Sequence, residues 1–228
     1  MSPRLSVVIP VLNAARTLPV CLAAFSRWPN IEMIVSDGGS TDESTEVALR
    51  NNGRVVAGPP GRGAQLARGA SVAGGDWLLF LHADTVLDGN GQDAAGRFMA
   101  DPSNLRRAGY FRLALDDADP RARRIERLAA WRARALGLPY GDQGLLIARA
   151  FYDSLGGYRP LSLMEDVDLV RRIGRARLRL LDATATTSAV RYRRDGWTWR
   201  PLRNLFCLSL YFLGVPPKSL LRFYAGRR

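Results

Sequence analysis

Four short apolar runs alternate with helix-like segments over the first 81 residues, and this alternation limits the fold more than any other feature of the sequence. The run at residues 5–11, LSVVIPV, is apolar and rich in β-branched side chains, as in strands buried on both faces. Three further runs of strand length follow at residues 31–36, 54–57 and 76–81. Strand–helix repetition with short links predicts an α/β fold with a mostly parallel central sheet flanked by helices.

The segments between these runs carry helix signals. Asn13 is suited to cap a helix over residues 14–27, which ends before a proline. The Ser-x-x-Glu pattern that starts at Ser40 is a capping box, so a second helix is expected from there to about residue 51. A third helix is expected over residues 63–73.

The second half of the chain is less regular. Its expected elements are strands over 109–115, 144–148, 177–182 and 188–192, and helices over 121–136, 166–173, 201–213 and 217–224. No internal repeat or low-complexity linker interrupts it. The sequence therefore predicts one main domain at residues 1–190, followed by a basic, amphipathic helical appendage at residues 191–228.

Composition excludes several classes of protein. With 47% hydrophobic and 24% charged residues, the chain is that of a globular protein and not of a disordered or fibrous one. Cys21 and Cys207 lie far apart, which excludes a disulfide framework or a cysteine zinc site and fits a reducing, cytoplasmic compartment. His82 is the single histidine, so a multi-histidine metal site is excluded. We expect no signal peptide, and no run approaches the ~20 apolar residues that span a bilayer.

Positive charge is concentrated at the C-terminus. The net charge is +12, and residues 191–228 contribute nine basic side chains against the single acid Asp195. Codon bias can explain why arginine replaces lysine almost everywhere, but it does not explain this clustering. A one-sided positive end indicates an anionic partner, which could be nucleic acid, phospholipid head groups or a phosphorylated substrate.

Ligands of open α/β sheets bind at the carboxyl ends of the strands, and the second predicted strand ends in Ser36-Asp37-Gly38-Gly39-Ser40. Gly39 permits tight, positive-φ geometry, and Asp37 could accept hydrogen bonds from a base or a ribose. The alternative is a glycine turn with a helix cap.

The third predicted strand is followed by a glycine-rich entry to a helix, Gly61-Arg62-Gly63. Backbone N–H groups at such an entry can bind an anion, and Arg62 and Arg68 could add charge-assisted contacts to a diphosphate. The alternative is a flexible turn, and the phosphate-loop pattern is absent because no Gly-Lys-Ser/Thr follows.

The fourth predicted strand ends in Leu81-His82-Ala83-Asp84-Thr85. Alternate residues at a strand end can point to the same side, which would place His82 and Asp84 together. Asp84 is a hard oxygen ligand suited to Mg²⁺ or Mn²⁺, with nucleotide phosphates filling other positions. Alternatively, Asp84 caps the next loop and His82 is a buried histidine with its hydrogen bonds satisfied.

Adjacent carboxylates, Glu165 and Asp166, open the expected helix at residues 166–173. One of them could be a general base that takes a proton from an attacking hydroxyl. The alternative is helix capping, because the helix dipole favours acids at this end.

These motifs together resemble a known family. In order they read SVVIPVLNA, VSDGGSTDES, GxxxARG, LHADT, GLLIARAFYDSLGGY and EDVDLVRRI. The resemblance is to the family-2 glycosyltransferases, which have the nucleotide-diphospho-sugar transferase (GT-A) fold, and it covers about residues 5–175. It is closest to a compact bacterial subgroup found near radical-SAM and selenium-related genes, whose members share the LHADT form.

The resemblance implies a donor site for the nucleotide. Val11 and Asn13 would lie beside it, Asp37 would contact the uracil or ribose, and Arg68 matches an arginine near the nucleotide. The family often has a second acid where this chain has Gly38, so the base preference does not follow from the motif.

The resemblance also implies roles for the other acidic positions. His82-Ala83-Asp84 occupies the metal-binding Asp-x-Asp position, with histidine in place of the first acid and Asp84 as the direct ligand. Asp166 matches the catalytic base of inverting members, and Glu165 would orient it or the acceptor.

Asp142 and Gln143, in the stretch YGDQG, could bind hydroxyls of the sugar or acceptor, or they could form a plain turn. The implied reaction is a metal-assisted, inverting transfer from a nucleotide-diphosphate sugar to a hydroxyl acceptor, with UDP-sugar as the first candidate donor.

Two alternatives to this function are a sugar-nucleotide nucleotidyltransferase and a basic nucleic-acid-binding module. The first should carry Gly-x-Gly-Thr-Arg after its first strand, and this chain has Leu12-Asn13-Ala14-Ala15-Arg16 there. The second lacks any recognised motif, so no nucleic acid partner is expected.

The apolar run at residues 205–215, LFCLSLYFLGV, lies between two basic clusters. Such a run suits a helix lying in the interface of an anionic membrane, which would place the protein peripherally on the inner face of the cytoplasmic membrane and favour a lipid-linked acceptor. Alternatively, the run packs on the main domain or forms a homodimer contact.

Overall fold

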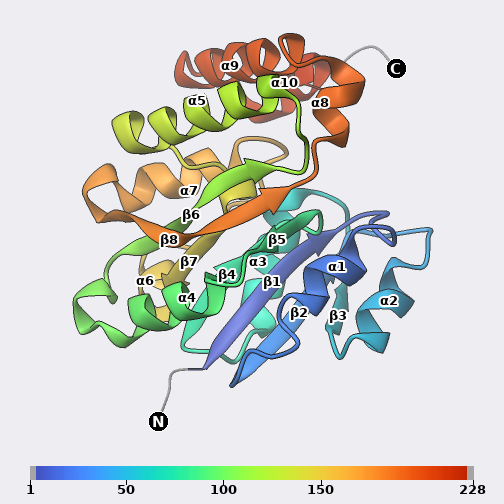
Figure 1. The fold of residues 1–228 in the computed structure, drawn as a ribbon, viewed down its shortest axis with the longest axis vertical. Helices are drawn as coiled ribbons and strands as arrows, with labels where there is room; N and C mark the ends of the chain where they lie inside the picture. Colours follow the sequence, from blue (N-terminus) through green and yellow to red (C-terminus); the bar gives the residue numbers. More distant parts are fainter. Residues whose placement is uncertain (1–3, 225–228) are drawn as a thin grey trace.

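The computed structural model describes residues 4–224 and builds one eight-stranded sheet from them (Figure 1). The strand order is β3-β2-β1-β4-β7-β6-β8-β5. The strands are β1 (Leu5–Val11), β2 (Ile31–Asp37), β3 (Arg54–Ala57), β4 (Trp77–Phe80), β5 (Thr85–Leu87), β6 (Ala108–Leu115), β7 (Leu145–Ala148) and β8 (Leu178–Thr187).

The first four strands form the parallel part of the sheet. β1 pairs in parallel with β2 and β4, and β2 pairs in parallel with β3. β6 and β8 are also parallel, whereas β7 is antiparallel to β4 and β6, and β5 is antiparallel to β8. The expected α/β fold with a mostly parallel sheet is confirmed, and the carboxyl ends of β1 to β4 meet at one edge.

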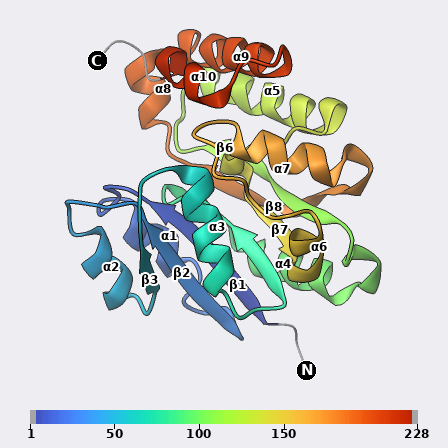
Figure 2. The same cartoon turned by 180° about the vertical axis from the view of Figure 1, so that it is seen from behind.

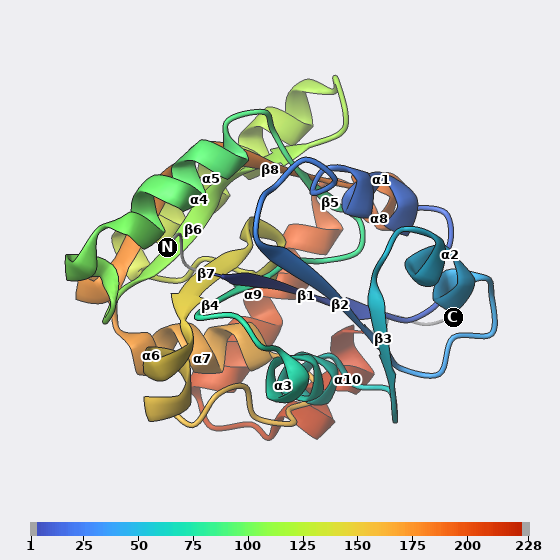
Figure 3. The same ribbon diagram turned by 90° about the horizontal axis from the view of Figure 1, so that it is seen from below.

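Helices cover both faces of the sheet. They are α1 (Leu18–Ala23), α2 (Ser44–Arg50), α3 (Arg62–Val72), α4 (Gly91–Ala100), α5 (Pro120–Leu136), α6 (Arg149–Ser154), α7 (Glu165–Ile173), α8 (Val190–Asp195), α9 (Trp199–Phe212) and α10 (Pro217–Tyr224). Helices α1, α2 and α4 lie on one face, and α3, α6 and α7 lie on the other (Figures 2 and 3). None of the helices within residues 4–224 has the length and apolar character needed to cross a membrane.

The core extends from the sheet into the C-terminal helices. Val7, Val8 and Ile9 of β1 are completely buried, as expected for a strand covered on both faces. Cys207 of α9 and Leu220 of α10 are also completely buried and belong to the same apolar cluster. The appendage expected at residues 191–228 therefore packs on the rest of the protein through its described part.

The first helix is shorter than expected. Residues 14–17 form a turn, and α1 begins at Leu18 with Thr17 as its N-cap. Asn13 has left-handed backbone geometry (φ 52°), and its side-chain oxygen accepts a hydrogen bond from the Thr41 N–H at 2.8 Å. The expected cap at Asn13 is wrong, because this side chain ties the loop after β1 to the loop after β2.

The capping box expected at Ser40 is also wrong. Helix α2 begins four residues later, at Ser44, with Glu43 at its N-cap. The Ser40 hydroxyl donates to the Asp37 carboxylate, and the Ser44 hydroxyl and N–H donate to Asp42. Local side-chain hydrogen bonds thus hold a longer loop between β2 and α2.

The last part of the sheet differs from expectation in two ways. The strand expected at 177–182 continues to Thr187 as β8, and the strand expected at 188–192 is the helix α8. Asp195 ends α8 and pairs with Arg200 at 2.7 Å, which stabilises the turn into α9. The elements β5, α4 and α6 have no counterpart among those expected.

Candidate functional site

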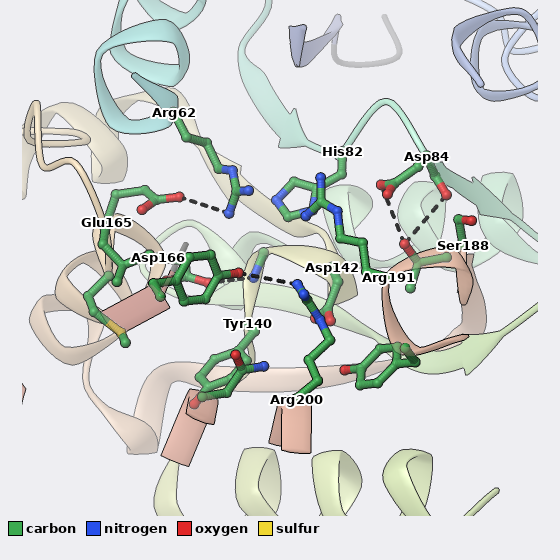
Figure 4. Close-up of a pocket in the computed structure, with 17 residues that line it drawn as sticks. Arg62, His82, Asp84, Tyr140, Asp142, Glu165, Asp166, Ser188, Arg191 and Arg200 are labelled. Carbon is green, nitrogen blue, oxygen red and sulfur yellow. Dashed lines mark hydrogen bonds and ion pairs between the residues drawn. The ribbon is translucent and has the colours of Figure 1, made fainter. Parts of the chain in front are cut away.

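A pocket lies where the ends of β4 and β8 meet the starts of α3 and α7 (Figure 4). The helices α8, α9 and α10 close its other side, at the end of the molecule toward which β1 runs (Figure 1). Its lining residues are Arg62, His82, Asp84, Tyr140, Gly141, Asp142, Leu163, Met164, Glu165, Asp166, Thr187, Ser188, Arg191, Tyr192, Arg200, Asn204 and Tyr224. Six of the sequence-predicted site residues are thereby brought together: Arg62, His82, Asp84, Asp142, Glu165 and Asp166.

The start of α7 presents Asp166 to the pocket. One carboxylate oxygen accepts the Gly141 N–H at 2.9 Å, and the other accepts the Val167 N–H at 2.8 Å. Met164, the N-cap of α7, has left-handed geometry (φ 63°) that is rare for a bulky side chain. Strained backbone of this kind clusters at functional sites, and here it sets the direction of the two carboxylates that follow.

Glu165 differs from Asp166 in its surroundings. Its side chain is only 2% exposed and pairs with Arg62 at 3.4 Å. Burial raises the pKa of Glu165; Arg62 opposes that rise and Asp166 adds to it. Together with Asp166, this pair places one guanidinium and two carboxylates along one wall of the pocket.

The loop between β4 and β5 contributes His82 and Asp84, while Ala83 between them is buried. Desolvation, together with Arg62 and Arg191, lowers the pKa of His82 well below its usual range, so the imidazole is neutral. The Asp84 carboxylate accepts a long hydrogen bond from the Thr187 hydroxyl, at 3.4 Å. Most of its hydrogen-bonding and ligating capacity is therefore open to the pocket.

Asp142 and Gln143 both lie in the short helix η2 (Gly141–Gln143), but only Asp142 lines the pocket. One Asp142 carboxylate oxygen is buried without a hydrogen-bond partner among residues 4–224, and burial raises the pKa of this acid. Gln143 does not line the pocket and is 1% exposed. Its amide donates to the Phe111 carbonyl and accepts from Arg132, so it holds η2 from inside the protein.

Four of the predicted nucleotide residues lie at the ends of β1 and β2, outside the pocket: Val11, Asn13, Asp37 and Gly39. Asp37 is 5% exposed, and its carboxylate accepts the N–H groups of Gly39 and Ser40. Gly39 has the expected positive φ of 90°, and Asn13 is exposed beside it. The Val11 carbonyl accepts the Gly38 N–H, which closes this corner.

Arg68 connects this corner to α3. Its guanidinium donates to the Asp37 carbonyl at 2.7 Å and covers Gly58 so closely that a Cβ there would lie 2.5 Å from it. The Arg68 Nε is buried and has no hydrogen-bond partner among the described residues. Arg68 therefore fixes the loop after β2 and keeps one donor free.

Residues from the last helices complete the pocket, and motif reasoning did not find them. Arg191 and Tyr192 come from α8, Arg200 and Asn204 from α9, and Tyr224 from α10. Arg200 is 7% exposed and pairs with Asp195. Asp195 is the single acid of this basic segment, but it also pairs with the exposed Arg194, so the sequence held no signal that singled out Arg200.

No group of three or more histidine, cysteine, aspartate or glutamate side chains suited to hold a metal ion occurs within residues 4–224. Asp84 is the carboxylate with open capacity at the end of β4, beside a neutral imidazole. A hard divalent cation could be held there by Asp84 only if a ligand such as a diphosphate supplied further oxygens.

A family comparison matches the N-terminal part of the chain. Residues 6–92 match the model described as Glycosyl transferase family 2. The PGL/p-HBAD biosynthesis glycosyltransferase of Mycobacterium bovis (strain BCG) is 39% identical over 95 residues, or 38% of this chain. This chain covers 37% of that relative's own length. The matched segment, residues 6–92, contains Asp37, Arg68 and Asp84.

Solved structures are similar over most of the chain. S. aureus TarS 1-349 covers 97% of this chain with a TM-score of 0.62 and 13% identity, over 69% of its own length. Glucosyl-3-phosphoglycerate synthase from Mycobacterium tuberculosis, in complex with Mn²⁺, UDP and glucosyl-3-phosphoglycerate, covers 82% with a TM-score of 0.57 and 21% identity, over 70% of its length. These similarities establish the GT-A fold, as expected from the motifs.

Proposed function

We propose that this protein transfers a sugar from a nucleotide-diphosphate sugar, with a UDP-sugar as the first candidate, to a hydroxyl group of an acceptor. The observation that carries the proposal is Asp166, whose carboxylate is held by two backbone N–H groups in the same pocket as Asp84. In an inverting transfer the acceptor oxygen attacks the anomeric carbon directly, so one general base is needed. We assign that role to Asp166.

Glu165 is assigned to orientation and not to proton transfer. It is nearly fully buried and paired with Arg62, which also lines the pocket. This pair fixes the guanidinium of Arg62 where negative charge develops on the leaving diphosphate. Preorganised cations at such a position stabilise the transition state.

The residues at the end of β4 fit a divalent metal, Mn²⁺ or Mg²⁺, that arrives with the donor. Asp84 would hold it together with diphosphate oxygens, and the neutral His82 would lie beside it. A bound metal would supply charge neutralisation to the leaving diphosphate. The similar M. tuberculosis synthase structure contains Mn²⁺ and UDP, which supports this assignment.

The nucleotide is assigned to the corner formed by β1 and β2. Asp37 and Gly39 would face the base or ribose, with Val11 and Asn13 beside it. Arg68 is the cation of this corner, and its guanidinium, which donates to the Asp37 carbonyl, would lie near an anionic ligand.

The acceptor is assigned to the side of the pocket formed by η2 and the last helices. Asp142 offers a buried oxygen with an unused acceptor position, which suits a hydroxyl donor. Gln143 acts indirectly by holding η2 through Phe111 and Arg132.

The free, buried cysteines Cys21 and Cys207 fit a reducing cytoplasm. From the LHADT stretch at residues 81–85 we also propose that the chain belongs to the compact bacterial subgroup that shares this motif.

Gly141→Ala is expected to lower transfer on the order of 10²-fold with little change in melting temperature, because misplacing a reacting group by about 1 Å has this effect. A Cβ at this position would lie 2.6 Å from the His82 Nε2 and 3.6 Å from Asp166, so the loop, the imidazole or the base must shift. Steady-state kinetics with the active donor would measure the loss. The matched control is Gly89→Ala, where a Cβ meets no atom within 4 Å. Wild-type kinetics for both variants would contradict the assigned geometry.

The proposed donor class is tested by thermal shift with UDP-, GDP- and dTDP-sugars, with and without Mn²⁺. A true donor at about 100 times its Kd adds ~2.7 kcal/mol to the free energy of unfolding. For a chain of this size the melting temperature should rise by roughly 5–10 °C. UMP and free sugars serve as controls and should give smaller shifts.

Product analysis separates this proposal from its alternatives. A glycosyltransferase releases the nucleoside diphosphate from the donor, with slow transfer to water when no acceptor is present. A nucleotidyltransferase would release pyrophosphate from a nucleoside triphosphate and a sugar phosphate. Salt-sensitive binding of RNA or DNA without either product would overturn the proposal in favour of a nucleic-acid-binding module.

A further inference from the structure

Helices α9 and α10 expose an apolar surface, which we name the C-terminal apolar face. It consists of Trp199, Leu202, Leu205, Phe206, Leu213 and Phe223, each at least half exposed and Leu213 80% exposed. Trp199, Leu202, Phe206 and Leu213 recur at helical spacing, so they form one stripe along α9 and its end. Phe223 of α10 packs edge-on against Phe206, with ring centroids 5.9 Å apart, and this contact joins the two helices into one surface.

The other side of the same helices faces the core and the pocket of this protein. Cys207, Leu208 and Leu220 are buried in the core. Arg200, Asn204 and Tyr224 line the pocket. The C-terminal apolar face is therefore not needed to pack this protein, and exposed apolar patches of this kind mark interaction sites.

Positive charge lies beside this face. No acid occurs after Asp195, whereas Lys218 and Arg222 lie exposed on α10. Arg171 of α7 lies over the ring of Phe212, 4.9 Å from its centroid, and adds a cation from a neighbouring element. Arg227 and Arg228, which the sequence argument included in the basic flank, lie outside the described residues.

The charge decides between a second copy of the chain and a lipid surface. Two copies joined through this face would bring like charges together with no acid from residues 196–228 to offset them. An anionic bilayer offers the opposite charge, at about 1 kcal/mol for each basic side chain near its surface. A helix of 14 residues is too short to span the bilayer but suits one that lies in its interface.

We propose that the C-terminal apolar face docks on the surface of an anionic phospholipid bilayer, with Trp199 and the leucines inserted and Lys218 and Arg222 at the head groups. The pocket lies on the opposite side of the same two helices, so docking holds it one helix diameter, roughly 10 Å, from the membrane surface. Resting on the proposed function, this places the acceptor hydroxyl on a lipid-linked molecule.

The test is flotation of the full chain with phosphatidylcholine vesicles, with and without phosphatidylglycerol. The wild type should float with the phosphatidylglycerol vesicles at low salt and should float less at high salt, because salt shortens the Debye length. Point substitutions are preferred to truncation because α9 also supplies core and pocket residues.

Leu213→Asp should reduce vesicle binding by about tenfold or more. It removes an inserted leucine side chain and introduces a negative charge that the anionic lipid repels. Lys218→Glu combined with Arg222→Glu should reduce it by at least a similar factor. Leu49→Asp is the matched control, because Leu49 is 62% exposed on α2, far from α9 (Figure 1). All variants should keep the wild-type melting temperature.

Three results would overturn the proposal: no flotation at low salt, equal flotation of Leu213→Asp and wild type, or equal losses for Leu213→Asp and Leu49→Asp. Light scattering on the same samples tests the second-copy alternative. A dimer that Leu213→Asp dissociates, without vesicle binding, would assign the face to a homodimer. The donor thermal shift of Leu213→Asp should equal that of wild type, so failure of docking and failure of the proposed function are read separately.

Discussion

Asp166→Asn is expected to lower the rate of sugar transfer by about 10²-fold or more, the usual loss when a general base is removed. The asparagine keeps the volume of the side chain and one acceptor oxygen, which can still receive the Gly141 N–H that Asp166 accepts at 2.9 Å. It cannot take a proton from the acceptor hydroxyl. Steady-state kinetics should therefore show a loss in kcat, while the melting-temperature rise caused by the donor stays close to that of wild type.

The matched control is Asp153→Asn, an exposed acid on α6 outside the pocket, which should keep wild-type turnover. Glu165→Gln should mainly disturb Arg62, its partner at 3.4 Å, and so should weaken donor use as well as turnover. Transfer by Asp166→Asn at a rate near that of wild type would show that another group is the base.

The parallel half of the sheet could be predicted from the sequence because its signal is local. Strands β1 and β4 are buried on both faces, and such strands appear as continuous apolar runs between turn residues. The ends of these strands share one edge, so the position of Asp37 and Asp84 at the carboxyl ends of the strands was correctly expected. Ligand binding at this edge stays a prediction.

Loops were harder to predict because polar residues that cap helices also bridge loops. Asn13 and Ser40 have the side chains of N-caps, yet they bind each other's loops across 27 residues of sequence. The N–H of Asn13 donates to the Ser40 hydroxyl at 2.9 Å. Capping rules consider only the residues of the next helical turn. They fail when the side chain forms its hydrogen bond with a neighbouring loop instead.

The far wall of the pocket could not be predicted because its residues come from three helices late in the chain. Arg191, Arg200 and Tyr224 lie in a segment whose basic and aromatic composition indicated a membrane surface. Composition does not tell which side of a helix faces the protein. The structure separates the two sides of α9: Arg200 turns to the pocket and Leu202 to the surface.

Asp84→Ala is expected to lower transfer by about 10²-fold or more and to remove the effect of Mn²⁺ on donor binding. Asp84 is the carboxylate at the end of β4 with open ligating capacity, since its contact with the Thr187 hydroxyl is 3.4 Å long. Charge stabilisation by a metal ion is worth several kcal/mol at a developing diphosphate, and each 1.36 kcal/mol is about tenfold in rate. Calorimetric titration with the donor, with and without Mn²⁺, measures the binding part.

Asp93→Ala, an exposed acid on α4 outside the pocket, is the matched control and should keep the wild-type response to metal. Equal donor affinity of wild type and Asp84→Ala, with and without metal, would contradict the assignment of Asp84.

His82→Asp tests the same site in the opposite direction. Burial is the largest cause of the low pKa of His82, and it would also disfavour an ionised carboxylate in its place. Arg62 and Arg191, the other two causes, would favour the carboxylate, as would a bound metal ion. His82→Asp is therefore expected to retain transfer and to tighten the use of metal, which a lower Mn²⁺ concentration for half-maximal activity would reveal.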